Sequence, residues 1–87
     1  MSLQLEFLTP AKTLRTGSVD EIIAPSVLGE VGILPLHTEY ITLLKEGDLR
    51  LRSQGKESMY HIGGGLLTVE KDKVTILVER VTETPSN

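Results

Sequence analysis

The sequence contains no cysteine and no tryptophan, and its 87 residues include only one phenylalanine and two tyrosines. The absence of cysteine excludes a disulfide framework, a thiol nucleophile and any cysteine-based zinc site. The scarcity of aromatic rings leaves little on which nucleic-acid bases could stack. The hydrophobic core must therefore be built from leucine, isoleucine and valine.

Basic residues and histidines are also few. Nine Lys and Arg against twelve Asp and Glu give a formal net charge of −3, and the basic residues form no stripe of the kind that binds a phosphate backbone. The two histidines, His37 and His61, lack the spacing of metal ligands. We therefore expect no nucleic-acid partner, no bound metal and no cofactor.

Long apolar runs are missing as well. No segment approaches the roughly 18 apolar residues that a membrane span needs, and the N-terminal residues 1–6 lack a basic region followed by an apolar stretch. A chain of this length holds one domain with one compact core. We expect a soluble, cytoplasmic domain, which could still sit beside a membrane by binding something embedded there.

The chain does contain many short segments that are typical of strands. Apolar and polar residues alternate over residues 3–7 and 48–52, and residues 74–78 are rich in β-branched side chains. Turn signals separate such segments every eight to twelve residues, and no apolar pattern keeps a helical spacing over three turns. The pattern predicts an all-β sandwich or barrel.

Local signals refine this expectation. Residues 13–24 are expected to form two short strands or one kinked strand, with a bend or bulge at Gly17-Ser18. Arg50 and Arg52 are expected to point outward on a solvated face. We assign residues 1–82 to the domain and residues 83–87 to a polar tail.

The stretch richest in residues with special backbone preferences is GEVGILPLH, residues 29–37. Glycine can adopt positive φ and Pro35 fixes φ near about −65°, so we expect a loop of fixed shape that turns a corner between sheets or presents a surface. The apolar residues in or beside this stretch either cap the core or serve as exposed anchors for a partner; they are Val27, Leu28, Ile33 and Leu36.

No constellation of residues supports catalysis. The triplet Gly63-Gly64-Gly65 could cradle a phosphate, but it lacks the Lys-Ser/Thr ending of a P-loop, so a bulge or the close approach of another backbone is favoured. The serines lie in ordinary turn contexts, and Asp20 and Glu21, adjacent in a strand, point to opposite faces. We expect a protein that is not an enzyme and acts by presenting surfaces to a partner.

Three segments, in order along the chain, resemble one family. GEVGILPLH at 29–37, IGGGLLTV at 62–69 and KVTILV at 73–78 are similar to the N-terminal domain of the ε subunit of F-type ATP synthases, the δ subunit of mitochondria. The resemblance covers residues 3 to 82. It implies a flattened β-sandwich of about ten strands at the foot of the rotor's central stalk. It also implies a non-catalytic subunit of a proton- or sodium-translocating enzyme, which couples rotation of the c-ring to the γ subunit at the cytoplasmic face of the bacterial inner membrane.

The resemblance further implies which residues meet these partners. Glu30, with Val27 and Leu28 beside it, would face the polar loops of the c-ring. The positions that match the side facing γ are Thr9, Leu36, His37 and Thr42. The sequence departs from the family pattern at two positions, because Leu36 replaces the usual glycine before the histidine and Glu39 replaces a usual proline.

Typical members of the family continue into a helical hairpin that inhibits ATP hydrolysis. This sequence stops at Asn87, so we expect no nucleotide binding and no inhibitory arm from these residues. The alternative interpretation is a stand-alone β-sandwich adaptor or small-ligand-binding module with another partner. An adaptor has no need for Glu30 and His37 together, whereas a coupling subunit must present both to large partners.

Overall fold

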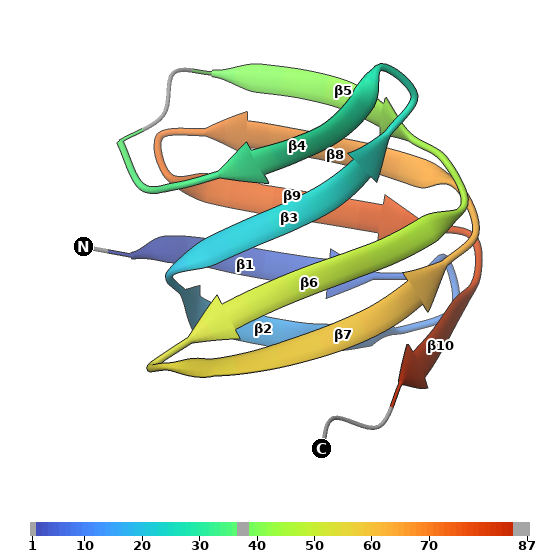
Figure 1. The fold of residues 1–87 in the computed structure, drawn as a ribbon, viewed down its shortest axis with the longest axis horizontal. Helices are drawn as coiled ribbons and strands as arrows, with labels where there is room; N and C mark the ends of the chain where they lie inside the picture. Colours follow the sequence, from blue (N-terminus) through green and yellow to red (C-terminus); the bar gives the residue numbers. More distant parts are fainter. Residues whose placement is uncertain (1, 37–38, 85–87) are drawn as a thin grey trace.

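The structure is a computed structural model that describes residues 2–36 and 39–84. The described residues form ten strands (Figure 1), which confirms the expected all-β fold of about ten short strands. The strands are β1 (Leu3–Leu8), β2 (Thr13–Val19), β3 (Glu21–Ser26), β4 (Gly29–Ile33), β5 (Tyr40–Leu44), β6 (Gly47–Ser53), β7 (Lys56–Ile62), β8 (Gly65–Glu70), β9 (Lys73–Val78) and β10 (Val81–Thr84). The described part of the chain has no helix long and apolar enough to cross a membrane.

The ten strands belong to one sheet that curls back on itself into two layers. The strand order is β10-β7-β6-β3-β5-β8-β9-β1-β2, and β4 pairs with β3 outside this path. The sheet turns from one layer to the other between β3 and β5, where the ladder contains a single residue pair, Ser26 with Leu44. In Figure 1 one layer contains β5, β8, β9, β1 and β2, and the other contains β4, β3, β6, β7 and β10.

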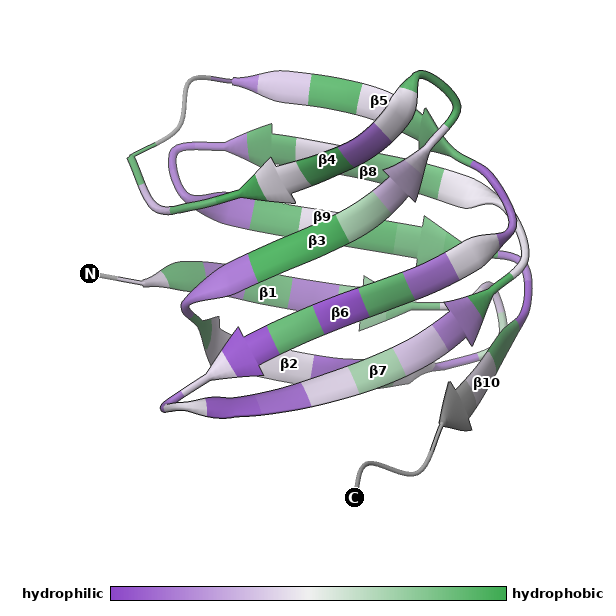
Figure 2. Cartoon of the chain, in the orientation of Figure 1, coloured by the Kyte–Doolittle hydropathy of each residue, from purple (hydrophilic) through white to green (hydrophobic). Residues whose placement is uncertain are grey.

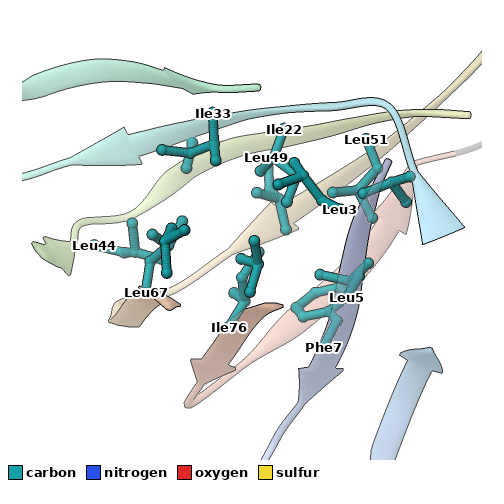
Figure 3. Packing of buried hydrophobic residues seen from close by; sticks show 14 of the residues in the cluster. Leu3, Leu5, Phe7, Ile22, Ile33, Leu44, Leu49, Leu51, Leu67 and Ile76 are labelled. Carbon is teal, nitrogen blue, oxygen red and sulfur yellow. The ribbon is translucent and has the colours of Figure 1, made fainter. Parts of the chain in front are cut away.

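The core lies between the layers and follows from the alternation seen in the sequence. Leu3, Leu5 and Phe7 of β1 are buried, whereas the residues between them are not. Figure 3 shows leucine, isoleucine and phenylalanine side chains from several strands meeting in this space. Phe7 also meets Tyr60 of β7 edge to face, with ring centroids 5.1 Å apart. The core therefore consists of aliphatic side chains with one phenylalanine, as the composition predicts.

Residues 29–37 do not form one loop, so that expectation is wrong for residues 29–33. These residues form β4, which pairs antiparallel with β3 in a hairpin. Gly29, with φ 119°, closes the hairpin turn, and Val31 and Ile33 follow the two-residue period of a strand, so the glycines do not end the ladder. Only residues 34–39 connect β4 to β5, and Ile33 is buried in the core.

Of the two alternatives expected for residues 13–24, the structure has two strands, β2 and β3, but the bend lies elsewhere than predicted. Gly17 and Ser18 sit inside β2 and pair with β1. Gly17 takes φ 124° without breaking the ladder, and the chain turns at Asp20 instead. The irregularity in the β1–β2 register lies between Phe7 and Leu8.

The end of the described chain remains in the sheet. Strand β10 pairs antiparallel with β7 as far as Thr84, so the pairing continues two residues past the boundary at residue 82. The division into a domain of residues 1–82 and a tail of residues 83–87 stays a prediction. Residues 85–87 lie outside the described residues.

The glycine triplet at the start of β8 marks a close approach of another backbone, as its sequence context favours. A Cβ atom on Gly65 would overlap the carbonyl oxygen of Leu77 and lie 2.9 Å from Cγ1 of Val78. Gly64 adopts φ 79°, a left-handed conformation that suits glycine. The triplet therefore allows β8 to start tightly against the end of β9.

Candidate functional site

The outer surface of the β5-β8-β9-β1 layer carries a row of leucines. The strand registers place Leu43, Leu66, Leu77 and Leu8 side by side on this surface, one from each strand. Leu43 is 59% exposed and Leu77 37% exposed, and Ile41, two residues before Leu43, is 68% exposed. We call these five residues the apolar face. Single exposed leucines are ordinary, but a continuous row on one sheet indicates an interaction surface.

Acidic side chains border the apolar face at one end. Glu39 and Glu70 line the same shallow surface hollow as Ile41 and Thr68. Both glutamates are exposed. A partner that covers this surface would match it best with an apolar patch that has basic residues at its margin.

The opposite outer surface has a different character, because its charged side chains are paired. Arg50 of β6 contacts Glu30 of β4 at 3.1 Å, and Arg52 contacts Glu21 of β3 at 2.9 Å and Glu57 of β7 at 3.6 Å. Figure 2 shows hydrophilic and hydrophobic residues alternating along β6. We call this surface the ion-paired face. It confirms the expected outward position of both arginines, and it has the polar composition of a surface that water can cover.

His61 lies on the ion-paired face between two carboxylates. Its Nδ1 is 3.1 Å from Oδ1 of Asp48, and its Nε2 is 3.2 Å from Oε2 of Glu46. The hydrogen bond to Asp48 and then that to Glu46 hold the pKa of His61 above its ordinary value of 6.5. Both ring nitrogens can donate only in the imidazolium form, so the pair of carboxylates favours the charged histidine.

The stabilisation from His61 is expected to depend on pH. Because the pKa is raised on folding, this contribution is fully present below about pH 6.5 and is lost as the pH rises through the folded-state pKa. We expect the difference in free energy of unfolding between the wild type and His61→Gln, measured by urea denaturation, to be larger at about pH 6 than at about pH 9. An equal difference at both pH values would show that the carboxylates do not favour the charged ring.

The turn between β3 and β4 brings together the three residues expected to face the c-ring. Val27 is 53% exposed and Leu28 is 88% exposed, so they do not cap the core. The Ser26 hydroxyl accepts the Leu28 N–H at 3.1 Å and donates to the Gly29 carbonyl at 2.6 Å, which fixes the turn. Glu30 is exposed beside the turn, where Arg50 contacts it.

Three of the residues expected to face γ lie among the described residues, and they come from three different parts of the chain, namely Thr9, Leu36 and Thr42. Leu36 is 70% exposed in the connection from β4 to β5. Thr9 follows β1, and its hydroxyl accepts the N–H groups of Ala11 and Lys12. Thr42 has an inward-facing side chain that is only 8% exposed. A partner near Thr42 would therefore touch its outward neighbours on β5, which the sequence analysis did not single out.

His37 lies outside the described residues, so its expected position at γ stays a prediction. His61 uses both ring nitrogens on carboxylates of its own surface. Within residues 2–36 and 39–84, no group of three or more histidine, aspartate and glutamate side chains is placed to hold a metal ion.

Comparison with known proteins gives a consistent result. The family described as the β-sandwich domain of the ATP synthase delta/epsilon chain matches residues 2–84. The chain is 39% identical over 80 residues to the ATP synthase epsilon chain of Nitrosococcus oceani, covering 91% of this chain and 57% of that protein. It is 46% identical over 77 residues to the epsilon chain of Geotalea daltonii, covering 88% of this chain and 56% of that protein. The chain thus spans little more than half the length of these relatives.

A solved structure agrees with the sequence relatives. A chain in a cryo-EM structure of the Euglena gracilis mitochondrial ATP synthase, which includes OSCP, F1 and the c-ring, superposes with a TM-score of 0.89 at 25% identity. The match covers 94% of this chain and 53% of that one. The family match extends over all of the described residues and the fold agrees, so this chain belongs to the ATP synthase delta/epsilon β-sandwich family.

Proposed function

We propose that this chain is a non-catalytic subunit of the central stalk of an F-type ATP synthase, in which it couples rotation of the c-ring to the γ subunit. The observation that carries the proposal is the apolar face, where this domain leaves Ile41, Leu43 and Leu77 exposed on one outer surface. Exposing apolar side chains to water is unfavourable, and a permanent partner that buries them removes this cost. The complex would lie at the cytoplasmic face of the membrane and contact the membrane only through the c-ring.

The γ subunit is the proposed partner of the apolar face. A mechanical coupling needs a firm attachment, and an apolar row with a polar margin is the composition of a stable protein interface. The carboxylates of Glu39 and Glu70 at one border favour a partner segment with lysine or arginine beside its apolar patch. Leu36, His37, Thr9 and the outward neighbours of Thr42 are the proposed contacts around this face.

The c-ring is the proposed partner of the β3–β4 turn. Val27 and Leu28 supply exposed apolar contacts and Glu30 supplies a carboxylate, which suits the basic and polar loops of the ring. The backbone N–H of Val27 donates to the Leu43 carbonyl at 3.0 Å. The turn is therefore hydrogen-bonded to the end of β5, so a torque on the turn is transmitted directly into the layer that would hold γ.

The first experiment for this proposal is co-purification and calorimetric titration of the chain with γ from the same source. We expect one-to-one binding, with affinity reduced in His37→Ala. If the folded chain does not bind γ, the rotor role is wrong and a β-sandwich adaptor with another partner becomes the better interpretation.

Reversing the charge of Glu30 is expected to weaken attachment to the c-ring specifically. Glu30→Lys should lower the affinity of the chain–γ complex for detergent-solubilised c-ring by about three- to tenfold, and the loss should be greater at low salt. Thermal stability should change little, because an exposed ion pair such as that with Arg50 contributes only about 0–1 kcal/mol. Glu57→Lys, which also breaks an exposed pair, is the matched control; an equal loss in both variants would contradict a role for the turn.

A further inference from the structure

Leu36 combines two unfavourable features that a loop leucine normally avoids. Its backbone has φ 69°, in the left-handed region that disfavours residues with a Cβ. Its side chain is also 70% exposed, so the strain is not offset by burial in the core. A strained residue persists where neighbouring groups hold it, and it is often part of a functional surface.

The group that holds Leu36 is Asp72, which lies 36 residues later in the sequence. The backbone N–H of Leu36 donates to Oδ1 of Asp72 at 2.7 Å. This is a short, charge-assisted bond of the stronger kind. It ties the connection between β4 and β5 to the turn between β8 and β9.

Asp72 is itself fixed on two sides. The β8–β9 turn has only two residues between the paired Glu70 and Lys73, namely Lys71 and Asp72, with φ 51° and 62°, which is the mirror-image turn that suits tight hairpins. The carbonyl oxygen of Asp72 also accepts the Gln4 N–H at 2.8 Å, at the start of β1. The Asp72 carboxylate is thus presented from a rigid corner of the sandwich.

We propose that Asp72 is a positioning residue that holds Leu36 in its left-handed conformation, so that the exposed leucine is a preformed apolar anchor for the γ subunit. The identity of the partner rests on the proposed function, whereas the positioning by Asp72 does not. Because the anchor is already fixed before contact, binding does not lose the conformational entropy that ordering a free loop would require. The fixed leucine extends the contact from the apolar face onto the loop that leads into β5.

Two substitutions of Asp72 distinguish its role as hydrogen-bond acceptor from its role in the turn and from its negative charge. Asp72→Gly removes the acceptor but keeps a residue that accepts φ 62°, so the turn should survive. Asp72→Asn keeps an acceptor oxygen and also tolerates the left-handed region, but it removes the charge. In the free chain, we expect hydrogen exchange at the Leu36 amide to be about fivefold faster in Asp72→Gly and less accelerated in Asp72→Asn, which keeps a neutral acceptor. Unchanged exchange in Asp72→Gly would overturn the positioning role.

Titration of the same variants with γ tests the anchor. We expect Asp72→Gly to bind about three- to tenfold more weakly and Asp72→Asn to lose less affinity than Asp72→Gly. Equal weakening in both variants would mean that the charge of Asp72 contacts γ directly, which overturns the proposal. If the wild type does not bind γ, the partner assignment fails together with the proposed function, while the exchange rates still decide the positioning role.

Leu36→Gly provides an independent variant. Glycine relieves the left-handed strain, so the melting temperature should rise by about 4 °C, while loss of the anchor should weaken binding to γ about tenfold. A more stable variant with undiminished affinity would show that Leu36 is not an anchor.

Discussion

Replacing Leu43 and Leu77 together by aspartate is expected to weaken binding to γ by at least about 100-fold while the domain stays folded. The two leucines lie in one cross-strand row with Leu66 between them, so both charges would be forced into the centre of the interface without partners. Both side chains point outward, so the substitutions remove no side chain from the core. Calorimetric titration measures the affinity, and thermal unfolding checks the fold.

The ion-paired face offers a control with the same geometry. Ile23 and Met59 are outward, half-buried residues that flank Arg50 on neighbouring strands, just as Leu43 and Leu77 flank Leu66. Aspartate at both of these positions should leave the affinity for γ within about twofold of the wild type. An equal loss in the two double variants would show that the apolar face is not the γ surface.

Placing a methyl group on Gly65 is expected to destabilise the fold by about 3 kcal/mol. The added Cβ would overlap the Leu77 carbonyl oxygen and press on Val78, and the backbone of β9 cannot give way without breaking its own ladder. For a domain of this size that loss lowers the melting temperature by roughly 15 °C. Differential scanning calorimetry of Gly65→Ala gives the measurement.

Gly32→Ala is the matched control for Gly65→Ala. Gly32 also lies in a strand, but a Cβ there would meet no atom within 4 Å. We expect its stability to remain within about 0.5 kcal/mol of the wild type. If both alanines are tolerated equally, β8 and β9 are not packed as closely as the structure has them.

The sequence predicts the strands well because apolar and polar residues alternate regularly in β1 and β6. It does not predict which strands become neighbours, since the parallel pairing of β1 with β9 joins segments from opposite ends of the chain. It also misplaces β4, because two glycines in a short segment are typical of a loop and only the pairing with β3 makes them part of a strand. Long-range pairing overrides local preference at this point.

The candidate site is harder to predict for a related reason. The runs YITLL and VTILV in β5 and β9 are apolar on both faces, and such runs are typical of strands buried on both sides. The structure buries only one side, with Thr42 inward and Ile41 and Leu43 outward. The register of β5 decides which residues are exposed, and nothing local fixes it. The excess of apolar residues in these strands is the local signal for an apolar outer surface.

The most direct test of the apolar face uses the absence of cysteine in the chain. A single cysteine replacing Ile41 on the apolar face, or Met59 on the ion-paired face, is reactive toward a thiol reagent without background from other positions. The labelling rate is then compared between the free chain and the chain assembled with γ and the c-ring. We predict that assembly slows labelling at position 41 by at least about tenfold and leaves position 59 unchanged. Unchanged labelling at position 41, or protection at position 59 instead, would contradict docking through the apolar face.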